Sequence, residues 1–156
     1  MKLRGYLIAL LMVCSLAPSA IAQSNLNAAT GERYVPRLGD IMNAVQSRHI
    51  KLWFAGKARN WQLATYELDL LKAGLLEAAV LYEGIPVTNV TTMKKPVDSI
   101  SAAIEARDDR RFAKALGEFT DGCNACHKSM GRGFIVMRIP NEQPFGDQSF
   151  APEAKR

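Results

Sequence analysis

The 156-residue sequence has few residues that could form cross-links or bind a metal ion in a cluster: three cysteines and two histidines. One cysteine, Cys14, lies in a segment that we expect to be removed, so the mature chain keeps two thiols that stand three residues apart. No further thiol is left for a disulfide scaffold. A structural zinc site needs a second pair of ligands, and His49 stands alone in the sequence. These two classes of small stabilised domain are therefore excluded.

The sequence also has no apolar run long enough to span a membrane. Its longest such run, residues 6–16, is only about 11 residues long, whereas a spanning helix needs roughly 20. A basic segment precedes the run and the small residues Ala20 and Ala22 follow it, which predicts a secretory signal peptide, residues 1–22, that is removed on export. The net charge of +5 falls to +3 without Lys2 and Arg4. Because no basic tract is interleaved with aromatic residues, nucleic-acid binding is not expected.

Both remaining cysteines belong to one motif, Cys123-Asn124-Ala125-Cys126-His127. Two cysteines in this spacing, followed directly by a histidine, are the attachment signature of a c-type haem. On a helix, Cys126 and His127 lie at about 300° and about 40° when Cys123 is set to 0°, so all three share an arc of about 100°. A thioredoxin-like redox pair is the alternative, but that motif follows a strand, and we predict no strand here. Export together with haem attachment predicts the bacterial periplasm.

Hydrophobic periodicity predicts four helices around this motif. We expect helices over residues 37–56 and 61–83, a crossover loop over residues 85–95, a third helix from Pro96 to about Arg107, and a fourth helix that carries the motif. The core stripe of the fourth helix includes two of the motif's residues: Phe112, Leu116, Phe119, Cys123, Cys126 and Met130. The fold class is therefore all-α, an antiparallel four-helix bundle with covalently attached haem c.

The domain plan follows from these elements. After the signal peptide, residues 23–36 form a loose leader and residues 37–133 form the haem-binding bundle. Residues 134–156 form an extended C-terminal tail, which Phe145 and Phe150 are placed to pin to the bundle.

The export signal, the four predicted helices and CNACH on the last helix together resemble the class II c-type cytochromes, the cytochrome c′ group and its low-spin relatives. The resemblance covers roughly residues 38–130. It implies a periplasmic four-helix bundle, often a homodimer, that shuttles electrons or binds small gases at the haem. It further implies that His127 is the proximal iron ligand and that Cys123 and Cys126 form the thioether attachments.

The group opposite His127 decides the function, because an open iron site binds gas whereas a filled one favours electron transfer. His49 is the first candidate, since a buried unpaired polar group costs about 1–3 kcal/mol and iron would satisfy one ring nitrogen. Met42 is the second candidate. The two are seven residues apart, about 10.5 Å along a helix, so only one can reach the iron. The remaining alternative is an open iron site, with His49 either bonded to a carbonyl in the core or tilted to the surface beside Arg48.

The sequence thus predicts a periplasmic monohaem c-type cytochrome that transfers single electrons, with His127 proximal and His49 distal, and that is not an enzyme. Its expected partners are periplasmic redox proteins and, by the resemblance, a second copy of itself. It is not expected to bind nucleic acid or to span a membrane after signal cleavage. The alternatives are a five-coordinate haem protein that binds NO or CO, and the haem subunit of a larger oxidoreductase.

Overall fold

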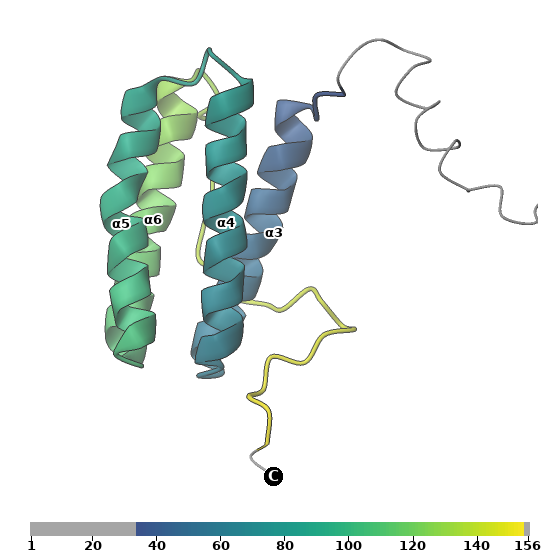
Figure 1. Ribbon diagram of the computed structural model, residues 1–156, viewed down its shortest axis with the longest axis vertical. Helices are drawn as coiled ribbons and strands as arrows, with labels where there is room; N and C mark the ends of the chain where they lie inside the picture. Colours follow the sequence, from purple (N-terminus) through teal and green to yellow (C-terminus); the bar gives the residue numbers. More distant parts are fainter. Residues whose placement is uncertain (1–33, 155–156) are drawn as a thin grey trace, which may run out of the picture. The chain divides into compact units, whose positions relative to one another are not determined.

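The structure of the chain, a computed structural model, describes residues 34–154. The predicted signal peptide, residues 1–22, lies outside the described residues, as does most of the predicted leader. Four helices make up the described part: α3 (Leu38–Lys57), α4 (Trp61–Leu81), α5 (Val87–Glu105) and α6 (Asp109–Ser129). They run in alternating directions (Figure 1). No strand occurs between residues 34 and 154. The prediction of an all-α four-helix bundle is therefore confirmed.

The two tight turns of the bundle are encoded in the same way. Arg59 and Arg107 adopt left-handed backbone conformations, with φ of 58° and 52°, and each is followed by a residue that caps the next helix. The Asn60 side chain accepts a hydrogen bond from the backbone N–H of Leu63, and Asp108 accepts one from Arg111. Both caps satisfy backbone donors that a helix start leaves free.

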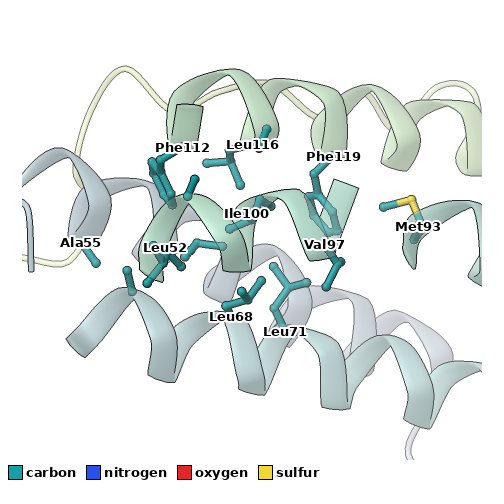
Figure 2. Packing of buried hydrophobic residues seen from close by; sticks show 14 of the residues in the cluster. Leu52, Ala55, Leu68, Leu71, Met93, Val97, Ile100, Phe112, Leu116 and Phe119 are labelled. Atoms are coloured by element: carbon teal, nitrogen blue, oxygen red, sulfur yellow. The ribbon is translucent and has the colours of Figure 1, made fainter. Parts of the chain in front are cut away.

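The core lies between the four helices, where apolar side chains from each of them meet (Figure 2). Phe112 and Phe119 of α6 are its largest members, at 1% and 0% exposed. Leu52, Leu71 and Ile100 supply fully buried aliphatic side chains from α3, α4 and α5. The core stripe predicted for α6 is thus confirmed over its first half, and the motif continues the same stripe toward the end of the helix.

Helix α5 begins earlier than its sequence suggested. The predicted crossover loop, residues 85–95, is wrong, because the helix starts at Val87 and Pro96 lies inside it. A proline in a helix interior costs about 3 kcal/mol. Burial of Met93, which stands four residues before the buried Val97 on the same stripe, offsets much of this cost, since a buried methionine contributes about 1.5–3 kcal/mol.

One acidic residue of α4 lies in the interior of the bundle. Glu67 is 1% exposed. The guanidinium Nη1 of Arg48 in α3 lies 3.1 Å from its Oε2. This ion pair joins the two helices and makes the burial of the carboxylate tolerable.

The C-terminal tail is irregular, as expected, and is held along the bundle. Phe150 is buried and lies 5.9 Å from the ring of Phe54, centroid to centroid. The ammonium group of Lys51 lies 4.6 Å from the centroid of Phe145. The two aromatic residues therefore pin the tail to α3. None of the described helices is both long enough and apolar enough to cross a membrane.

Candidate functional site

The three reactive residues of the motif lie on the last two turns of α6 and line one cavity. Cys123, Cys126 and His127 all contribute to its wall, together with residues from the other three helices and from the segment after α6. The cavity has a volume of about 610 Å³ and a largely apolar wall. Pockets of about 300–1,000 Å³ with such walls hold organic ligands and cofactors. The motif therefore opens into a cavity that residues of all four helices line.

The two thiols are not suited to redox catalysis. Neither cysteine forms a disulfide in the described part of the chain. Burial raises the pKa of Cys123 to about 12, with a smaller contribution from the Cys126 thiol beside it. Burial also raises the pKa of Cys126, and a hydrogen bond with Asn89 offsets part of that effect. Because catalytic redox pairs have a lowered thiol pKa, the thioredoxin-like alternative is disfavoured.

The end of α6 turns the chain back toward the motif. Gly131 adopts a left-handed conformation, with φ of 69°. The N–H groups of Gly131 and Arg132 donate to the carbonyls of Lys128 and His127, at 3.2 and 2.7 Å. This is the Schellman pattern of helix termination, which needs glycine at the left-handed position. The residues that follow, 132–138, pass back beside the motif, and we call them the strap.

The strap contacts His127 and Asn124 of the motif. The imidazole Nδ1 of His127 lies 2.9 Å from the carbonyl oxygen of Ile135. A carbonyl oxygen only accepts hydrogen bonds, so Nδ1 carries the proton and donates it. The other ring nitrogen, Nε2, then has a free lone pair, which is the form in which histidine binds metals.

Of the two candidates for the position opposite His127, the structure brings only Met42 to the cavity. Met42 lies in the first turns of α3 and lines the wall together with His127. His49 is 1% exposed and does not belong to that wall. It pairs with Thr120, which precedes His127 by seven residues, about 10.5 Å along α6. His49 thus lies level with the middle of the bundle.

His49 has the environment of a core histidine. Its Nε2 lies 2.8 Å from the hydroxyl oxygen of Thr120, and that hydroxyl donates its own proton to the carbonyl of Leu116. The Thr120 oxygen must therefore accept from His49, which leaves Nδ1 unprotonated. Among the described residues, Nδ1 has no hydrogen-bond partner. Burial lowers the pKa of His49 from 6.5 to about 4, so the ring is neutral at neutral pH.

Three further methionines line the cavity, namely Met93, Met130 and Met137. The last two follow His127 by only 3 and 10 residues, which places them poorly for a position opposite it. Met93 was missed, because its segment was expected to be a loop. A Cβ built on Gly122 of α6 would lie 2.6 Å from the Met93 sulfur, so this sulfur packs against the helix that carries His127. The spacing of Met93 from Val97 could have identified it as a core residue.

The cavity wall also contains charged side chains. Lys72, Lys94 and Arg132 are the cations on its wall, and the first two pair with Asp69 and Asp98 at 3.0 and 2.5 Å. The described residues contain no cluster of three or more histidine, cysteine or acidic side chains that could hold a metal ion alone. The wall therefore suits an organic cofactor with anionic groups better than a bare ion.

No family model, curated protein or solved structure matches the chain. The function must therefore be inferred from the cavity and the motif that lines it.

Proposed function

We propose that the chain is a monohaem c-type cytochrome of the bacterial periplasm that transfers single electrons to and from other redox proteins. The observation that carries the proposal is that the two cysteines and the histidine of CNACH open into one largely apolar cavity, which Met42 of another helix also lines. When bound, haem supplies an iron that alternates between its ferric and ferrous states.

The residues of the motif would divide the binding between them. Cys123 and Cys126 would hold the edge of the haem through thioether bonds. His127 would bind the iron through Nε2, since its Nδ1 donates to Ile135. The cations on the wall, above all Arg132, would offset the charge of the haem carboxylates. The residues present thus fit the cofactor that the motif implies.

We assign the sixth position to Met42 in preference to His49. Met42 lines the same cavity as His127, and a thioether is a known ligand of haem iron. His49 is engaged by Thr120 two helical turns away from the level of His127. Histidine–methionine ligation raises the reduction potential of a haem compared with two histidines. A carrier with this ligand pair would work at a higher potential than the His49 assignment predicted.

The test begins with protein produced in a bacterium that attaches haem to exported chains. The wild type is expected to keep its haem after acidic organic extraction, whereas the Cys123→Ala/Cys126→Ala variant is expected to lose it. Wild-type protein without covalent haem would refute the proposal. An intact haem with no one-electron exchange with any redox protein partner would refute the carrier role.

Two single variants test the sixth ligand. Met42→Leu is expected to convert a low-spin ferric spectrum to a high-spin one and to accelerate uptake of carbon monoxide. His49→Gln is expected to leave both unchanged. The reverse result would restore His49 as the ligand. A wild type that is already high-spin and takes up carbon monoxide rapidly would support the five-coordinate gas-binding alternative instead.

A further inference from the structure

The strap is fixed to the motif by a residue that has no part in haem attachment. The side chain of Asn124, the first residue between the two cysteines, makes two hydrogen bonds to the backbone of Met137. Its Nδ2 donates to the carbonyl of Met137 at 2.9 Å, and its Oδ1 accepts from the N–H of Met137 at 2.7 Å. The side-chain amide of Asn124 thus pairs with both the N–H and the carbonyl of Met137, as the backbone of a neighbouring β-strand would.

We call these two hydrogen bonds between Asn124 and Met137 the clamp. The clamp lies next to the contact that orients His127. Ile135, whose carbonyl accepts from Nδ1, is only two residues from Met137. At the other end of the strap, the Schellman turn at Gly131 fixes where the chain leaves α6. A segment held at both ends has few conformations left, so the position of the Ile135 carbonyl depends on the clamp.

The strap alternates between exposed side chains and side chains on the cavity wall. Phe134 and Val136 are 82% and 73% exposed, whereas Ile135 and Met137 line the cavity. Near its start, the N–H of Ile135 donates to the carbonyl of Arg132 at 2.9 Å. At Met137, the two hydrogen bonds to Asn124 restrain the backbone directly.

We infer that Asn124 is a positioning residue: it holds the strap so that the Ile135 carbonyl fixes the ring orientation and the proton of His127, the iron ligand. The inference rests on the proposed function, because it concerns the bond between His127 and haem iron. Partners that accept the second ring proton of a metal-binding histidine orient the ring and raise its basicity. Loss of the clamp should therefore weaken the bond between His127 and the iron while leaving the attachment cysteines in place.

Two variants remove the clamp from opposite sides. Asn124→Leu removes both side-chain partners, and Met137→Pro removes the backbone donor without changing the motif. Ala125→Ser is the control within the motif, since Ala125 is exposed. Met137→Leu is the control in the strap, since it replaces the side chain and keeps the N–H.

The readout is the iron–histidine stretching vibration, measured by resonance Raman scattering on the ferrous protein just after carbon monoxide is removed by a light flash. Asn124→Leu is expected to shift it to a lower frequency than in the wild type, and Ala125→Ser is expected to match the wild type. Met137→Pro is expected to give a lower frequency than Met137→Leu, because both lack the methionine side chain of the cavity wall and only the proline variant lacks the N–H. Unchanged frequencies in both clamp variants would overturn the inference. If Asn124→Leu does not mature, the comparison of Met137→Pro with Met137→Leu decides.

Amide hydrogen exchange provides a second readout that does not depend on the iron. The amides of the strap should exchange about tenfold faster or more in Asn124→Leu than in the wild type, because two hydrogen bonds are lost. Unchanged exchange would show that the clamp does not hold the strap and would overturn the inference. A wild type that lacks covalent haem would refute the proposed function, and this exchange measurement would still test the clamp.

Discussion

Replacing one buried glycine should separate packing strain from helix propensity in this bundle. Gly56, near the end of α3, is buried. A Cβ built there would overlap Cε1 and Cζ of Phe112 and lie 2.7 Å from Cδ1, where ordinary contacts begin at 3.4 Å. The ring has no free space, since it is 1% exposed and contacts the rings of Trp53 and Trp61 at centroid distances of 6.5 and 6.0 Å.

Gly56→Ala should therefore destabilise the protein. Overpacking of a filled core costs about 1–3 kcal/mol, and the gain in helix propensity returns at most about 1 kcal/mol. The matched control is Gly117→Ala in the interior of α6, where an added Cβ meets no atom within 4 Å in the described part of the chain. Gly117→Ala should raise the free energy of unfolding by about 0.5–1 kcal/mol.

The assay is thermal and urea unfolding of both variants beside the wild type. A domain of this size changes its Tm by about 4 °C per kcal/mol, so the Tm of Gly56→Ala should lie several degrees below that of Gly117→Ala. Equal stabilisation by both substitutions would refute the packing of Phe112 against Gly56, and with it the helix pairing of α3 with α6 at this end of the bundle.

Three further predictions concern single features of the fold. The pKa of His49 is about 4 in the folded protein and 6.5 in the unfolded chain, so the unfolded chain takes up the proton first as the pH falls below 6.5. The free energy of unfolding should therefore drop by about 2 kcal/mol between pH 8 and pH 5. Urea titrations of His49→Gln should not show this drop. Arg48→Met should lower the free energy of unfolding by about 1–3 kcal/mol, because it leaves the Glu67 carboxylate buried without its ion-pair partner. Adding Glu67→Met should recover most of this loss, which a double-mutant cycle measures. Pro96→Ala should raise the Tm, because it restores a backbone donor inside α5 and should increase the free energy of unfolding by about 1–3 kcal/mol. An unchanged Tm would mean that the helix has already adapted to the proline.

The helices that the sequence predicted well are those whose buried positions follow a regular spacing of three and four residues, although α3, α4 and α6 each bury one polar side chain as well: His49, Glu67 and Thr120. In α4 and α6 the helix start also carries a side-chain cap, which α3 lacks. For all three helices the predicted ends differ from the observed ones by only a few residues. Helix α5 was misjudged because its first half is rich in threonine and lysine and because Pro96 looked like a start signal. In its first half, only the four-residue spacing of Met93 from Val97 indicates the buried stripe that the other helices cover.

The candidate site divides in the same way. The half on α6 is local, since five consecutive residues contain both the proposed attachment points and the proposed iron ligand. The choice between Met42 and His49 is not local: both lie on one stripe of α3, and only the level at which α3 packs against α6 separates them. The sequence could not predict the hydrogen bonds of Asn124, because they join a helix side chain to an irregular segment that has no periodicity.

The C-terminal tail is attached to the bundle by two sets of contacts of very different range in the chain. The contacts of the strap join residues 8 and 13 positions apart, whereas the side-chain amide of Asn60 donates to the carbonyl of Ala151 across 91 positions. Short loops close at low entropic cost and long ones at higher cost. The far end of the tail should therefore open and close as its own small cooperative unit, while the near end stays shut and the cavity keeps its wall.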